Sequence, residues 1–202
     1  TESRYCYKNQ PVMGEWNLTR LAEALLPLFG KDREKAVNIA QDEISEFNKA
    51  YHDSWVSGMR SKLGIINEEP EDEELIQQLL NMMQKYGADY TNTFVSLTFD
   101  RNEESEMFRG SEFKSWYKLW MTRISVQEKN ITFQLMKSSN PAIIPRNHRV
   151  EEALAAADTG DFSVMERLLN ALARPYENLP EQAEYAELPV EGSCKYRTFC
   201  GT

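Results

Sequence analysis

The chain has 202 residues, of which 41% are hydrophobic, and its formal net charge is −9 at neutral pH. This length and apolar content are sufficient for the packed core of one domain. The acidic balance argues against nucleic-acid and anionic-membrane partners, and no apolar run approaches the roughly 18 residues of a membrane span. The three cysteines have no metal-ligand spacing, so we expect a cytoplasmic protein without a disulfide scaffold.

Apolar residues recur at helical spacing through the first half of the chain. The pattern predicts helices over about residues 15–29 and 32–63, each followed by a glycine, Gly30 and Gly64. Another helix is predicted over residues 75–86, after an acidic turn at 68–74. Residues 89–99 are rich in threonine and phenylalanine, which suits a strand, but a lone strand would have no partner. We therefore predict a helix there.

The second half is also helical in pattern. After a polar link at 101–110, an aromatic face predicts a helix that starts near Phe113 and continues towards Met136. Two short amphipathic helices follow, with Leu154, Leu168 and Leu169 in their apolar stripes. The predicted fold is mainly α and has three parts: a helical region at 1–137, a helix pair at 138–176 and an irregular tail at 177–202.

No catalytic or metal-binding motif is visible in the chain. The nine glycines are too far apart to form a phosphate-binding loop. His52 and His148 lack a ligand partner at helical spacing, and we interpret His52 as a surface or packing residue. Arg146 and Arg149 are predicted to form structural ion pairs with the acidic middle of the chain. The tryptophans are predicted to lie in the core, at Trp16, Trp55, Trp116 and Trp120.

Two separated motifs carry a family resemblance. The first has Arg4-Tyr5 followed by Asn9-Gln10-Pro11 and by residues 16–22, and the second is the run at 140–176, which contains NPAIIPRNH and LLNALARPY. In this order they resemble the carboxy-terminal part of the selenoprotein O family. The resemblance covers both ends well and residues 68–134 weakly. Ser3 departs from the pattern, which usually has glycine before the arginine.

The resemblance implies a place in a larger protein. Members of this family resemble protein kinases in fold and transfer AMP from ATP, with magnesium, to serine, threonine or tyrosine hydroxyls of proteins. Their nucleotide- and metal-binding residues precede the motif that begins here at Arg4, so we expect them before Thr1. The chain is interpreted as the helical carboxy-terminal part of this pseudokinase, a non-catalytic scaffold that binds neither ATP nor metal. Its expected partners are the missing amino-terminal half and protein substrates.

Two other interpretations stay open. The leucine-rich helix pair around Gly160 is also typical of a free-standing helical interaction module, although a repeat array needs about three copies. A thiol redox protein is the third interpretation, and it rests on the cysteines of the tail. A glycine-rich loop, a lysine and a metal-binding aspartate encoded upstream of Thr1 would favour the transferase.

The resemblance also singles out Cys200, third from the end of the chain. Family members carry cysteine, or selenocysteine in animal forms, at this distance from the terminus, whereas the companion cysteine of the animal forms is Arg197 here. An accessible thiol near a cation is a reactive one, and we predict a reversible disulfide from Cys200 to Cys194 or Cys6. Mild oxidation followed by non-reducing peptide mapping tests this. A Cys200 that stays a thiol while the protein is oxidised contradicts it.

Overall fold

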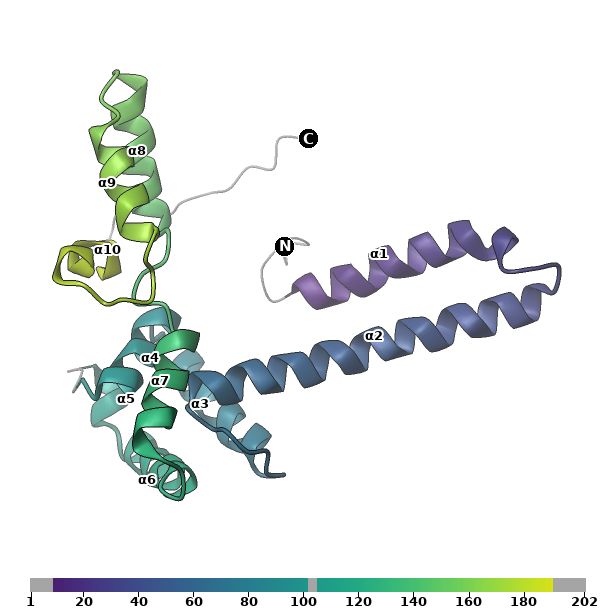
Figure 1. Cartoon of the computed structure of the whole chain (residues 1–202), viewed down its shortest axis with the longest axis horizontal. Coiled ribbons are helices and arrows are strands. Elements are labelled where there is room, and N and C mark those ends of the chain that lie inside the picture. The colour runs from purple at the N-terminus through teal and green to yellow at the C-terminus, as the bar shows by residue number, and fades with distance from the viewer. Residues whose placement is uncertain (1–8, 102–104, 191–202) are drawn as a thin grey trace. The chain divides into compact units, whose positions relative to one another are not determined.

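A computed structural model describes residues 9–101 and 105–190 of the chain (Figure 1). Every regular element within these ranges is a helix, which confirms the predicted mainly α class. The protein-kinase-like arrangement stays a prediction. None of the described helices combines the length and the apolar composition that crossing a membrane requires.

The chain divides into two compact units, residues 1–58 and 59–202; the boundaries predicted at 137 and 176 stay predictions. The first unit contains α1 (Gln10–Leu25), a short 3-10 helix (Leu26–Leu28) and most of α2 (Arg33–Lys62). Gly14 of α1 lies against Phe47 of α2, because a Cβ on this glycine would stand 3.2 Å from the ring. Trp16 is 44% exposed, so its predicted core position is wrong.

The second unit contains the last turn of α2 and a series of shorter helices. They are α3 (Asp72–Tyr86), α4 (Tyr90–Phe99), α5 (Glu106–Arg109), α6 (Ser111–Ile124), α7 (Lys129–Ser139), α8 (Asn147–Asp158), α9 (Ser163–Leu172), a 3-10 helix (Pro180–Gln182) and α10 (Ala183–Ala186). Their apolar faces bury Leu63, Ile76, Leu79 and Phe94 almost completely. Burial of such side chains is the main favourable term in folding.

Two tryptophans of α6 fasten this core, as predicted. Trp116 and Trp120 are buried and stack with ring centroids 5.8 Å apart. The Trp116 indole N–H donates to the Leu75 carbonyl at 2.8 Å, and that of Trp120 to the Leu63 carbonyl at 2.9 Å. Each indole therefore adds a satisfied hydrogen bond to its buried apolar area. Gly64, the residue directly after Leu63, has φ +71° and lies so close to Thr132 that a Cβ would clash at 2.6 Å.

The predicted helix at 89–99 is confirmed as α4, in spite of its threonines. Asp89 caps the helix, because its carboxylate accepts the Asn92 backbone N–H at 2.8 Å. The hydroxyls of Thr93 and Thr98 donate to the carbonyls four residues earlier, both at 2.7 Å. These contacts satisfy the hydroxyl groups within the helix, so that β-branched residues are accommodated in a buried position.

The continuous helix predicted from Phe113 towards Met136 is wrong, because α6 and α7 are separate. Gln127 lies in the break and binds the turn after α2. Its side-chain oxygen accepts the Ile66 N–H at 2.8 Å, and its amide nitrogen donates to the Gly64 carbonyl at 2.7 Å. These two hydrogen bonds require the chain to leave the helical path. Periodicity alone does not reveal such a polar contact.

The helices α8 and α9 lie side by side and form the predicted pair (Figure 1). Their core contains Ile143, Ala153, Leu168, Ala171 and Tyr185. Tyr185 belongs to α10, so part of the segment predicted as an irregular tail is helical and covers the pair. Leu154 is 50% exposed and Leu169 is 58% exposed, so their predicted burial is wrong. The small Ala153 and Ala171 form the contact face instead.

The burial of Leu168 predicts unequal effects for two adjacent leucines. Leu168→Ala removes a side chain from the core and should lower the free energy of unfolding by about 2–5 kcal/mol. Leu169→Ala removes an exposed side chain of the same size and should change it by less than about 0.5 kcal/mol. Urea unfolding followed by circular dichroism measures both. Equal losses would show that the α8–α9 packing is not as described.

Candidate functional site

The sequence-predicted redox residues Cys6, Cys194 and Cys200 lie outside the described residues. The predicted disulfide therefore stays a prediction. The other segment singled out by sequence, which begins at Asn140 and includes Arg146, is described completely. This run, residues 140–176, includes α8 and α9. Its first part, residues 140–146 between α7 and α8, is called the signature segment, and the candidate site is built from it.

Asn140 joins the signature segment to α2 and α4. Its side-chain amide donates to the Lys62 carbonyl at 2.8 Å and to the Thr98 hydroxyl at 3.0 Å. The Lys62 ammonium group returns two hydrogen bonds, to the Ser139 carbonyl at 2.9 Å and to the Asn140 side-chain oxygen at 3.3 Å. Because Asn140 is only 2% exposed, loss of its amide would leave several buried groups without partners.

Lys62 has an environment of carbonyl oxygens and aromatic faces. Its ammonium nitrogen lies 5.7 Å from the Tyr90 ring centroid and 5.4 Å from that of Phe94. Burial lowers the pKa of Lys62 below its ordinary value of 10.5. Cation–π contacts and carbonyl hydrogen bonds offset part of the lost hydration. All of these contacts are structural, and they hold the end of α2 against α4 and the signature segment.

Arg146 makes the second anchor of this segment. Its guanidinium donates to both carboxylate oxygens of Asp89, at 2.9 and 2.8 Å, and to the Asn92 side-chain oxygen at 3.2 Å. The Asn92 amide then donates to the Ala186 carbonyl at 3.1 Å. The predicted structural ion pair is confirmed for Arg146. One network thus connects the start of α8 with α4 and α10.

The electrostatics of Asp89 follow from this network. Burial by itself raises the pKa of the carboxyl, but hydrogen bonds from Arg146 and from the Asn92 N–H, together with the charge of Arg146, outweigh it. The net result is a pKa below the ordinary value of 3.8. Asp89 is therefore ionised at neutral pH, both as the cap of α4 and as the partner of Arg146.

Arg149, one turn into α8, also forms structural ion pairs, but its partners lie on α8 and just after α10 and not in the acidic middle that the sequence predicts. Its guanidinium donates to Glu152 at 3.0 Å and to Glu187 at 3.3 Å. A further hydrogen bond joins it to the Glu184 carbonyl at 2.8 Å. Because both carboxylates are exposed, these pairs contribute less than the Asp89–Arg146 pair.

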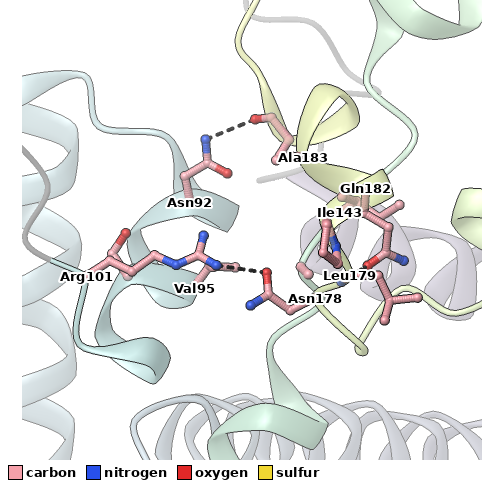
Figure 2. Close-up of a pocket in the computed structure, with 12 residues that line it drawn as sticks. Asn92, Val95, Arg101, Ile143, Asn178, Leu179, Gln182 and Ala183 are labelled. Atoms are coloured by element: carbon pink, nitrogen blue, oxygen red, sulfur yellow. Dashed lines mark hydrogen bonds between the residues drawn. The ribbon is translucent and has the colours of Figure 1, made fainter.

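A groove of about 330 Å³ lies beside the Arg146 network. Figure 2 shows Asn92, Val95 and Arg101 on one side and Leu179 and Gln182 on the other. The Arg101 guanidinium donates to the Asn178 side-chain oxygen at 3.0 Å across it. Sequence patterns do not reveal this groove, because half of its described lining residues belong to the segment predicted as an irregular tail. Pro180 followed by Glu181 and Gln182 is the signal for a helical turn that was available there.

The described side chains that line this groove can form hydrogen bonds but are not groups that transfer protons near neutral pH. The described residues of its lining offer amides, one hydroxyl and one guanidinium, and none of them is a carboxylate, imidazole or thiol. The Gln182 amide nitrogen is already engaged, because it donates to the Ala171 and Arg174 carbonyls at 3.0 and 2.8 Å. We therefore interpret the groove as a junction between α4 and the carboxy-terminal helices.

The described residues do not fit a magnesium–nucleotide site. Within them, no three side chains of the metal-ligating types come together. The glycines with positive φ, Gly30, Gly64, Gly87 and Gly160, are isolated along the chain. A phosphate-binding loop needs several backbone N–H groups directed at one anion. No step of a nucleotide reaction is therefore assigned to these residues.

The chain is similar to known proteins along its whole length. The family model described as protein adenylyltransferase SelO matches residues 1–173. The protein nucleotidyltransferase YdiU of Bacillus cytotoxicus is 57% identical over 204 residues, which cover 100% of this chain and 42% of the relative. For the protein of the same name from Clostridium botulinum (strain 657), the identity is 56% over 202 residues, which cover 98% and 41%. The chain therefore spans about two fifths of the length of these curated relatives.

The ion pair predicts a large effect of Arg146→Met. The variant keeps an apolar stem of similar length but leaves Asp89 without its guanidinium, which should cost roughly 3 kcal/mol of unfolding free energy at neutral pH. Arg174→Met is the control, because its ion pair with Glu177 is exposed and should contribute less than about 1 kcal/mol. Urea unfolding measures both variants.

The pH dependence gives a second readout of the same contact. The pKa of Asp89 is lowered in the folded state. Its ionised carboxylate therefore stabilises the fold fully at pH values above the ordinary pKa of the group, and this stabilisation is lost as the pH falls through the lowered pKa. Arg146→Met should therefore lose less stability on acidification than the unaltered chain. Parallel losses in the two proteins would show that this ion pair does not set the acid dependence.

Proposed function

The chain belongs to the SelO family of protein adenylyltransferases, and we propose that the protein of which it is a part transfers AMP from ATP to serine, threonine or tyrosine hydroxyls of other proteins. The observation that carries this proposal is the 57% identity over the whole chain to a relative named protein nucleotidyltransferase. The match to the SelO family model over residues 1–173 supports the proposal that the transferred group is AMP. We place the reaction in the cytoplasm, in keeping with the low cysteine content.

Within that protein, we propose that this chain is a helical scaffold and that ATP and magnesium bind to residues outside it. Two features support this division. The described residues lack a metal-binding cluster, and the polar residues of the signature segment are engaged in structural contacts. Asn140 binds Lys62 and Thr98, and Arg146 binds Asp89. A nucleotidyl transfer needs placed cations and donors around the phosphates.

We propose that the amino-terminal half of the whole protein is the main intramolecular partner of this scaffold. Large apolar side chains are exposed in the first unit, among them Val12 at 64% and Leu21 at 54%. Exposed apolar residues on one helix are typical of a surface that another segment covers. The kinase-like arrangement of the whole protein is part of the same proposal.

The proposal predicts a separation of activity between the chain and the whole protein. The whole protein should label a protein substrate when supplied with magnesium and ATP radiolabelled at the α-phosphate. The 202-residue chain alone should neither label it nor bind ATP in a calorimetric titration, because the phosphate-binding groups are absent from its described part.

Different failures of this experiment have different meanings. Micromolar ATP affinity of the chain alone would overturn the scaffold assignment and leave the transferase assignment standing. Labelling by the whole protein with another nucleoside triphosphate but not with ATP would overturn the adenylyl assignment. A whole protein that labels nothing with any nucleotide would contradict the transferase function itself.

A further inference from the structure

A second groove, which shares Ser96 and Arg101 with that in Figure 2, lies between the end of α4, α5 and the start of α6. Its volume is about 500 Å³, and its wall is aromatic. The Phe113 ring centroid lies 4.5 Å from that of Phe108 and 5.9 Å from that of Tyr117. Phe113 is buried, whereas Phe108 and Tyr117 are half-buried. The groove therefore offers a contiguous aromatic surface to a ligand.

Among the residues that the structure describes, the rim of this groove carries four cationic side chains and one carboxylate. The cations are those of Arg101, Arg109, Lys114 and Lys118, and the carboxylate is that of Asp100. The Tyr117 hydroxyl donates to Asp100 at 3.4 Å, so that this carboxylate already has a partner. The chain has a net charge of −9, so the excess of positive charge among these described lining residues is opposite in sign to the charge of the chain as a whole.

The two lysines present their charge outward from α6. Lys114 and Lys118 are four residues apart and therefore lie on the same face of the helix. Both are exposed, and within residues 9–101 and 105–190 neither ammonium group has an ion-pair partner. Arg101 is positioned more firmly, with its guanidinium carbon 5.4 Å from the Phe99 ring centroid and a hydrogen bond to Asn178.

A lysine stripe alone is usually a hydrated surface, but here it borders an apolar surface. Interfaces combine a desolvated aromatic centre with a charged rim, and complementary charge sets the choice of partner. We propose that this groove docks an acidic segment of a partner protein. An apolar side chain of the segment lies against Phe108 and Tyr117, and its carboxylates lie beside Lys114 and Lys118. Under the proposed function the partner is a protein substrate, and only that identification rests on the proposed function.

A short acidic segment fits this surface better than a nucleic acid does. Screening limits the reach of exposed charges to about 8–10 Å at physiological salt. A short segment therefore interacts mainly with the basic rim, whereas a long polyanion also meets the acidic remainder of the protein. The aromatic wall requires an apolar group in addition, which inorganic phosphate lacks.

Fluorescence anisotropy with a short labelled peptide of glutamate and aspartate around a central phenylalanine tests the proposal on the full chain. We expect salt-sensitive binding that Lys114→Glu/Lys118→Glu weakens at least about tenfold. Lys49→Glu/Lys129→Glu makes the same change in net charge outside the groove and should alter affinity less than about twofold. Equal weakening by both double variants, or by neither, overturns the proposal.

Further probes separate the peptide from simpler ligands. Replacing the central phenylalanine of the peptide by alanine should weaken binding, and Phe108→Ala in the protein should remove that difference. A lysine-rich peptide should bind the Lys114→Glu/Lys118→Glu variant better than the unaltered chain, and an unchanged circular dichroism spectrum shows that the variant is folded. If ATP or inorganic phosphate displaces the peptide more strongly than sodium chloride at equal ionic strength, the groove is a small-anion site and the proposal is wrong.

The same lysine variant separates docking from catalysis in the whole protein. Lys114→Glu/Lys118→Glu should raise KM for an acidic protein substrate and leave kcat unchanged, because docking is removed while the transfer step is intact. Peptide binding without any AMP transfer would retain the docking site and reject the proposed function. AMP transfer with an unchanged KM in this variant would retain the function and reject docking of substrates at this groove.

Discussion

The ion pair between Arg146 and Asp89 is the contact on which the carboxy-terminal half of the second unit depends. A single carboxylate caps α4 and accepts two hydrogen bonds from the guanidinium. These bonds offset the cost of removing both charges from water, which an isolated pair of this kind would not do. Through Asn92, the network continues to Ala186. Both grooves take part of their lining from α4, so their shape depends on this anchoring.

Local sequence patterns predicted most of the helices. Long-range polar contacts account for the places where the structure differs from that prediction. The glycine after α2 and the buried tryptophans of α6 follow from spacing and side-chain type. The separation of α6 from α7 follows from Gln127, which binds Gly64 and Ile66, distant in sequence. Leu169 satisfies the helical stripe but is exposed, because Tyr185 from the predicted irregular tail helps to select the buried face. Sequence patterns do not reveal the basic groove, because its cations come from α5, α6 and the link after α4.

The signature residues that reveal the family have structural roles in this part of the chain. Asn140 donates hydrogen bonds to the Lys62 carbonyl at the end of α2 and to the Thr98 hydroxyl of α4, and Arg146 forms an ion pair with Asp89. Specific polar networks of this kind fix one arrangement of the helices that contact them. The residues with the strongest family signal are therefore not those that carry the basic groove. Recognition of the family and recognition of a binding surface draw on different side chains.

The distances along the chain between contacting residues bear on how this protein is made. The hydrogen bond from Asn92 reaches Ala186 across 94 residues, and that from Asn140 reaches Lys62 across 78. Contacts of such separation form late, because loop closure must precede them. During synthesis, α4 emerges from the ribosome long before α10 can cover it. A nascent chain that stops before Tyr185 exposes part of the α8–α9 core, and such intermediates are the ones that chaperones bind.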